Sequence, residues 1–166
     1  MKYLKNLKEL MTIQLRSLYL GDIHVRRLLT EFIEKTTEPT LKEKFKAYAT
    51  QSADQVIILK RVFNDIYEQK RGGTSDIIIS MIDAAKHRLI NSKGKEIQDA
   101  IMILSIQKII HHKIVLLGAI CTYGKLMGFY EDVSILHHEL DLEKKMDRDL
   151  AMIAESIVDV KVPQYT

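Results

Sequence analysis

The sequence has few residues that cross-link a chain or interrupt it. It contains one cysteine in 166 residues, so no intrachain disulfide can form, which agrees with a reducing compartment. That cysteine, Cys121, lies in an apolar helical run, where a buried and inert thiol is expected. Two prolines and seven glycines leave room for long uninterrupted helices.

Segments that direct a chain to a membrane are also missing. The first 15 residues contain neither a continuous apolar core nor a small-residue cleavage site, as a signal peptide would. No apolar run reaches the roughly 20 residues that a bilayer requires. The net charge of +3 is small, and both signs are mixed along the sequence. We therefore expect a cytoplasmic protein that binds neither nucleic acid nor membrane.

The spacing of apolar residues predicts five helices and no strand. The expected helices span residues 2–36, 39–70, 76–90, 95–127 and 130–160. Pro39 suits the first turn of the second helix, and Thr74 or Ser75 suits the N-cap of the third. A short third helix between two long ones permits the long crossover of a four-helix bundle. The length fits one domain, residues 1–166, with a core of about 2–160.

Polar residues interrupt the apolar stripe near the middle of each long helix. Steps of three and four residues predict which side chains face the core. In a bundle of aligned helices, these interruptions would form one polar layer. The layer and its flanks consist of Asp22, Tyr48, Gln51, Gln107, His111, Glu143 and Asp147. Burial of a lone charge is costly, so these groups must pair with one another or hold a metal.

Several blocks of the sequence resemble those of a known family. The blocks are LRSLYLGDIH (15–24), EPTLKEKFKAYATQSADQVIIL (38–59), MIDAAKH (81–87), IQDAIMILSIQKIIHHKI (97–114) and LHHELDLEKKMDRDLAMIA (136–154). Their order and spacing are similar to those of the YciE/YciF proteins, which are small, stress-associated bacterial proteins containing a domain of unknown function. The resemblance implies an all-α, ferritin-like four-helix bundle with an additional short helix between helices two and four.

The family's metal motifs are altered in the first two helices. The stretch Y-x-A-E-x-Q corresponds to residues 19–24, and its glutamate corresponds to Asp22. The stretch H-x-x-E-T corresponds to residues 48–52, where Tyr48 replaces the histidine and Gln51 replaces the glutamate. The resemblance therefore leaves one carboxylate on these two helices.

The motifs of the last two helices are altered as well. The stretch E-H-Y-E corresponds to residues 110–113, where His111 is retained and both glutamates are absent. The stretch D-E-E-x-x-x-D corresponds to residues 141–147, where one acid is replaced by leucine while Glu143 and Asp147 remain.

The surviving residues are too few for a complete two-iron centre, which uses about four carboxylates and two histidines. We expect no metal cofactor. The alternative is one divalent transition metal, either iron, manganese or zinc, bound by Asp22, His111 and Glu143, with Asp147 as a weaker candidate. Without metal, a protonated His111 would pair with Asp22 or Glu143, and Tyr48 and Gln107 would complete the hydrogen bonding.

Three functions remain open from the sequence. The first is a stress-associated, ferritin-like protein without ferroxidase or other catalytic activity. The second is a metal-dependent oxidase or ferroxidase with a reduced ligand set. The third is a helical interaction module whose face binds a partner protein, which the sequence does not identify, or a second copy of the chain. We expect a homodimer, because the first and fourth helices carry more apolar residues than one core stripe requires. Examples are Ile109, Val115, Leu116 and Ala119.

Overall fold

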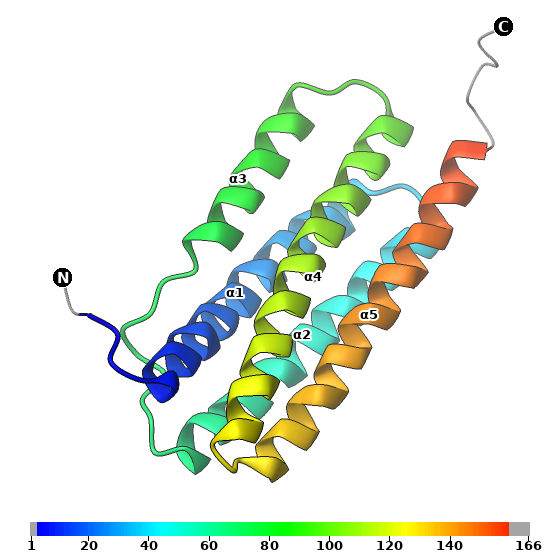
Figure 1. Ribbon diagram of the computed structural model, residues 1–166. Coiled ribbons are helices and arrows are strands. Elements are labelled where there is room, and N and C mark those ends of the chain that lie inside the picture. The colour runs from blue at the N-terminus through cyan, green and yellow to red at the C-terminus, as the bar shows by residue number, and fades with distance from the viewer. Residues whose placement is uncertain (1–2, 160–166) are drawn as a thin grey trace, which may run out of the picture.

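The computed structural model describes residues 3–159 and, for side chains, residues 3–157. Within that range it contains five helices and no strand (Figure 1). The helices are α1 (Leu7–Lys35), α2 (Pro39–Asp65), α3 (Asp76–Ile90), α4 (Lys95–Leu126) and α5 (Tyr130–Asp159). The predicted all-α architecture is confirmed, and Pro39 occupies the first turn of α2 as expected.

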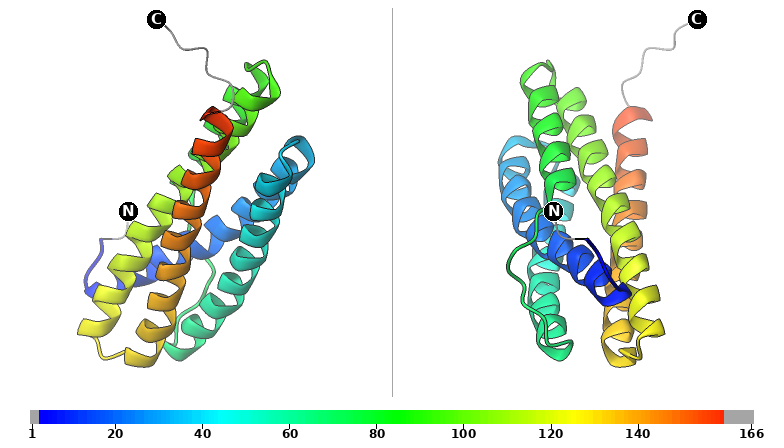
Figure 2. Two further views of the ribbon diagram at one scale, coloured as in Figure 1. Left: turned by 90° about the vertical axis from the view of Figure 1, so that its right-hand side faces the viewer. Right: turned by 60° about the vertical axis from the view of Figure 1, so that its left-hand side comes forward.

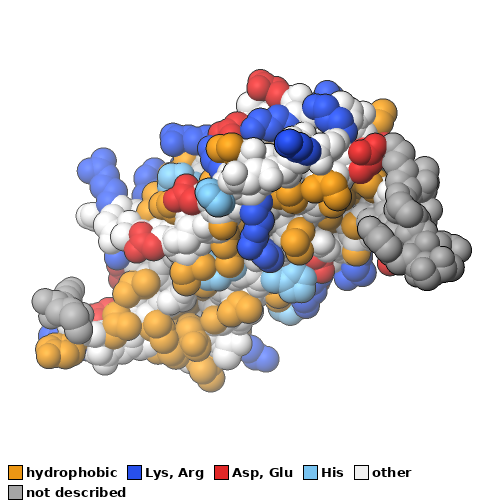
Figure 3. Space-filling view, turned by 90° about the horizontal axis from the view of Figure 1, so that it is seen from above, with side chains coloured by type: hydrophobic (Ala, Val, Ile, Leu, Met, Phe, Trp, Pro, Cys, Tyr) orange, Lys and Arg blue, Asp and Glu red, His pale blue; other side chains and the backbone are white. Residues whose placement is uncertain are grey.

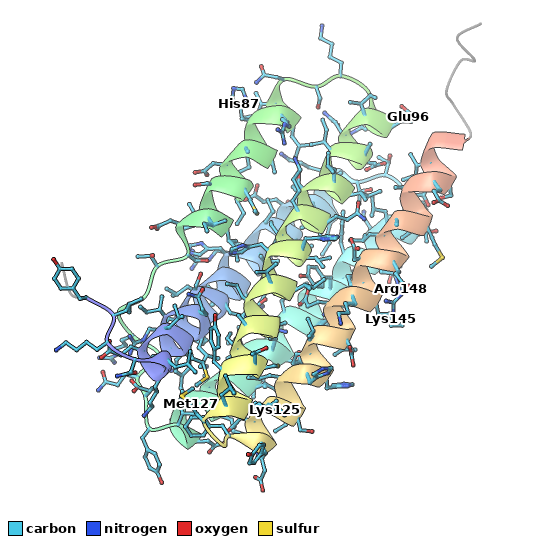
Figure 4. The ribbon with its side chains drawn as sticks, viewed as in Figure 1. His87, Glu96, Lys125, Met127, Lys145 and Arg148 are labelled. Carbon is cyan, nitrogen blue, oxygen red and sulfur yellow. The ribbon has the colours of Figure 1, made fainter. Side chains whose placement is uncertain are left out.

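The four long helices form two antiparallel pairs, α1 with α2 and α4 with α5 (Figures 1 and 2). The short helix α3 lies beside α4 and returns the chain along the bundle, so α2 and α4 run in the same direction. His87 and Glu96 lie at the end where α3 leads into α4, and Lys125 and Met127 lie at the opposite end (Figure 4). This is the long-crossover connection expected of a ferritin-like bundle.

The first two helices are shorter than predicted. Residues 3–6 are not helical, and α1 begins where the Asn6 side chain accepts a hydrogen bond from the Glu9 amide at 2.9 Å. The α2 helix ends at Asp65 because Tyr67 adopts a left-handed conformation, with φ of 56°. The Glu68 amide then donates to the Phe63 carbonyl at 2.9 Å, a bond typical of a Schellman-type helix end. The predicted helix start at Lys2 and the ends of the fifth helix and tail (160–166) lie outside the described residues.

The contact between α1 and α3 depends on small residues. Ser75 occupies the N-cap position of α3 as predicted, but its hydroxyl does not cap the helix. Instead it donates to the Ser17 carbonyl of α1 at 3.0 Å. A Cβ atom at Gly21 would overlap the Ile78 side chain. Gly21 thus allows α3 to pack closely against α1.

Two apolar clusters fill the bundle, one on each side of its polar middle. One cluster includes Phe32, Phe45 and Leu150, and the other includes Phe63 and Leu117. The helix α4 contributes to both and is apolar on most of its circumference. By length and hydropathy it could cross a membrane, but half of its most apolar window is buried inside the bundle. Its apolar character is therefore largely explained by packing against the other helices.

Candidate functional site

A lysine, Lys113 of α4, lies at the centre of the polar layer. Its ammonium nitrogen is 2.6 Å from Oδ1 of Asp22 on α1 and 2.6 Å from Oε1 of Glu143 on α5. It also donates to the hydroxyl of Tyr48 on α2 at 3.2 Å. All four side chains are fully buried. One residue from each long helix therefore meets at this point. The ammonium donates hydrogen bonds to Tyr48 and Glu143 and forms an ion pair with Asp22.

Two residues of α2 donate further hydrogen bonds to the Glu143 carboxylate. The Tyr48 hydroxyl donates to Oε2 of Glu143 at 2.7 Å, and the Gln51 amide donates to Oε1 at 3.3 Å. The Lys113 ammonium lies 5.1 Å from the centre of the Tyr48 ring. Glu143 therefore has hydrogen-bond donors on both oxygens, as a buried carboxylate requires.

The electrostatics of this layer leave one negative charge in excess. Burial raises the pKa of Asp22 to about 6; Lys113 opposes that rise, and Glu143 adds to it. Burial alone would lower the pKa of Lys113, but the carboxylates of Asp22 and Glu143 raise it well above its ordinary value. Lys113 thus stays charged at any physiological pH, while Asp22 is the group that takes up a proton.

A second buried polar pair extends the layer along α2 and α5. The Gln55 amide donates to Oε2 of Glu139 at 3.1 Å, and both residues are almost completely buried. Burial raises the pKa of Glu139. This pair lies one helical turn from Gln51 and Glu143. Polar side chains therefore occupy two successive turns of the interface between α2 and α5.

The predicted layer residues fall into two separate groups. Asp22, Tyr48, Gln51 and Glu143 meet in the core, as expected. The prediction that His111 faces the core is wrong, because its side chain is 66% exposed.

The second group lies on the surface between α4 and α5. Nε2 of His111 is 3.0 Å from Oδ2 of Asp147, and the Gln107 amide donates to Oδ1 of Asp147 at 3.0 Å. The predicted pairing of His111 with Asp22 or Glu143 is therefore also wrong. In Figure 4, Lys145 and Arg148 lie on the same helix as Asp147.

Cys121 is buried, and burial raises the pKa of its thiol to about 11. This agrees with the expectation of an unreactive thiol, since a thiol with a raised pKa supplies little thiolate at neutral pH.

The residues present do not fit the two-iron centre implied by ferritin-like bundles. Across the described residues, no three His, Cys, Asp or Glu side chains are grouped so that they could hold a metal ion. The space between the two core carboxylates is already taken by the Lys113 ammonium at ion-pair distance. A divalent ion there would have to displace a fully buried cation, so the site is built for an ammonium instead of a metal.

Removal of the Tyr48 hydroxyl should destabilise the protein. In a Tyr48→Phe variant, Oε2 of Glu143 would lose its 2.7 Å donor while remaining buried, at a cost of about 1–3 kcal/mol. Urea denaturation followed by circular dichroism measures the change. Tyr67→Phe is the matched control, because that side chain is 93% exposed. Equal midpoints for the two variants would contradict the role assigned to the Tyr48 hydroxyl.

Comparison with known proteins agrees with the geometry of the bundle. The family described as "Domain of unknown function (DUF892)" matches residues 6–162. The protein YciF of Escherichia coli K12 is 21% identical over 159 residues, which cover 95% of this chain and 96% of YciF.

Two solved structures have the same fold. The crystal structure of the E. coli stress protein YciF has a TM-score of 0.89 at 22% identity, covering 95% of this chain and 100% of that one. The protein YcfI of Rhodopseudomonas palustris has a TM-score of 0.85 at 21% identity, covering 89% of this chain and 94% of that one. With the family match over most of its length, the chain belongs to the DUF892 family and is a YciF-like helical bundle protein.

Proposed function

We propose that this chain is a cytoplasmic, stress-associated member of its family that works without a metal and has no ferroxidase activity. The observation that supports this is the position of Lys113, whose ammonium lies 2.6 Å from both core carboxylates. A cation that is part of the chain neutralises the charges that a bound metal would otherwise neutralise. The ammonium has no redox chemistry. A bundle that holds an ammonium in place of a metal can therefore keep its packing but cannot activate oxygen at this position.

The stress association has a separate basis. The E. coli relative YciF, of similar length and fold, is described as a stress protein. For this chain the proposal predicts that its abundance rises under at least one of oxidative, osmotic or acid challenge. Quantitative mass spectrometry of challenged and unchallenged cells measures this. Constant abundance under all three would count against the stress role and leave the metal question untouched.

The metal proposal is tested by elemental analysis of protein purified without a tag or chelator. We expect no stoichiometric transition metal after incubation with iron, manganese or zinc, and no oxygen consumption on addition of Fe²⁺. The matched variant is Lys113→Glu, which returns a carboxylate to the position where the YciE/YciF motif has one. One or two metal ions per wild-type chain would overturn the proposal. Metal bound only by the variant would support it, because the ammonium is then what excludes the ion.

A further inference from the structure

The interaction surface predicted on the first and fourth helices is only partly available. Ile109 and Leu116 are buried in the core and cannot contact a partner, whereas Val115 is exposed. The predicted homodimer would have to use such exposed residues, and it stays a prediction. A different surface, formed by α1 and α2, combines unpaired basic side chains with an exposed apolar one. Figure 2 shows α2 side by side with the second half of α1.

An open hollow between α1 and α2 is basic. Arg26 and Arg27 of α1 line it, together with the small residues Ala49 and Ala53 of α2. Neither guanidinium forms an ion pair with another side chain in residues 3–157. Two unpaired positive charges beside short side chains leave room for the carboxylates of a binding partner, which a guanidinium binds well.

A second open hollow, at the end of α2, is basic as well. Lys60, Lys70 and Arg71 line it, and none of the three forms an ion pair with a side chain that the structure describes. Its acidic lining residue, Glu68, is already paired with two basic side chains of α1. The outer face of α1 and α2 therefore presents two separate patches of uncompensated positive charge.

An exposed isoleucine lies between the two hollows. Ile57 is 65% exposed, and it follows Ala53 by four residues and precedes Lys60 by three, so all three lie on one side of α2. The hollows are about 11 residues apart along the helix, or about 16 Å. A chain of phosphates would gain little from an apolar side chain at this position. A helix that carries acidic residues on either side of an apolar patch would match the order of charge and apolar surface.

The form of this face also favours a macromolecule. Both hollows are open to solvent on one side, whereas a small-molecule site encloses most of its ligand. Figure 3 views the bundle from above, with Lys and Arg side chains gathered along its upper edge, on the side of α1 and α2. Such a field attracts an acidic partner before contact. We propose that the outer face of α1 and α2 binds an acidic amphipathic helix of a partner protein, with Ile57 as the apolar anchor. This inference does not depend on the proposed lack of metal chemistry.

Fluorescence anisotropy with a labelled synthetic peptide tests the proposal on the full chain. The peptide is helical, with leucines along one face and glutamates on either side of them, and the control peptide has glutamine in place of every glutamate. We expect micromolar binding of the acidic peptide and at least about tenfold weaker binding of the control. Binding should weaken as NaCl is raised, because salt screens exposed charges. Equal binding of the two peptides, or no binding of either, would overturn the proposal.

Charge-matched variants locate the binding surface. Arg26→Glu combined with Arg27→Glu should weaken binding of the acidic peptide at least about tenfold. Lys125→Glu combined with Arg148→Glu changes the net charge equally on α4 and α5 and should alter binding by less than about twofold. All four side chains are exposed, so both variants should keep the helical circular dichroism spectrum of the wild type. Equal weakening by the two variants would contradict a site on α1 and α2.

Two further substitutions test the apolar anchor and the sign of the charge. Ile57→Ser should weaken binding by about fivefold or more, whereas Met152→Ser, at a 62% exposed position of α5, should not. Asp54 is the acidic residue of α2 between the two hollows, so Asp54→Lys should strengthen binding. Unchanged binding in both Ile57→Ser and Asp54→Lys would contradict the proposal. Linear polyphosphate that binds more tightly than the peptide, and equally well to Ile57→Ser, would assign the face to a phosphate polymer and also overturn it.

Discussion

Replacement of Lys113 by methionine should destabilise the protein by about 3–5 kcal/mol, the cost of breaking a buried ion pair from one side. Methionine fills a similar volume but supplies no charge and no N–H donor. Asp22 and Glu143 would then face each other in the core without their shared cation, both fully buried. Chemical denaturation at pH 7.5 measures the loss, which is a large part of the 5–15 kcal/mol available to a typical domain.

The control for this substitution is Lys108→Met, on the same helix but exposed. A surface change of this kind is expected to alter stability by less than about 0.5 kcal/mol. If the two variants unfolded at the same denaturant concentration, the Lys113 ammonium would not hold the layer together.

A compensated variant distinguishes loss of charge balance from loss of packing. Adding Asp22→Asn and Glu143→Gln to Lys113→Met removes both uncompensated carboxylates while keeping the side-chain volumes similar. Neutral replacement of a complete buried ion cluster is often tolerated, so the triple variant should be more stable than Lys113→Met alone. Addition of Mn²⁺ or Zn²⁺ should stabilise Lys113→Met but not the triple variant, since only the former presents two carboxylates to a cation.

The helices and their order could be predicted because several independent signals agree. Apolar spacing, the sparse prolines and Pro39 at a helix start all indicate long helices with short connections. The error at the end of α2 has a specific cause. Tyr67 adopts a left-handed conformation that is unusual for residues other than glycine, and no glycine stood there to mark the helix end.

The core site could be predicted on three of its four helices. The helices α1, α2 and α5 have clear polar faces, so Asp22, Tyr48 and Glu143 were placed correctly. The helix α4 is apolar almost all round, so its periodicity does not identify the inward face. The stripe through His111 is therefore predicted to face the core, whereas the buried stripe in the structure consists of Ile106, Ile110, Lys113, Leu117 and Ile120. The feature of the sequence that indicates a buried ammonium is a lysine in the middle of an aliphatic stripe, together with acidic residues at the same level on the facing helices.

Replacement of Asp22 by asparagine should change how stability depends on pH. Burial raises the pKa of Asp22 from 3.8 to about 6, so the folded protein binds this proton more tightly than the unfolded chain. The stability that Asp22 contributes is therefore fully present below pH 3.8 and is lost as the pH rises through about 6. A shift of about 2 pH units corresponds to about 3 kcal/mol. Asparagine cannot ionise, so the variant does not suffer this loss.

We expect the free energy of unfolding of Asp22→Asn, relative to that of the wild type, to increase by about 2 kcal/mol between pH 4 and pH 7. Lys113 keeps its charge throughout, because its own pKa is raised, and it retains Glu143 as a partner in the variant. Any constant effect of the new amide on hydrogen bonding cancels, because only the change with pH is compared. Denaturant titrations at four or more pH values measure it, with the exposed Asp83→Asn as the control for removal of a carboxylate. A difference that stays constant with pH would mean that folding does not raise the pKa of Asp22. The layer would then carry its excess negative charge even in mild acid.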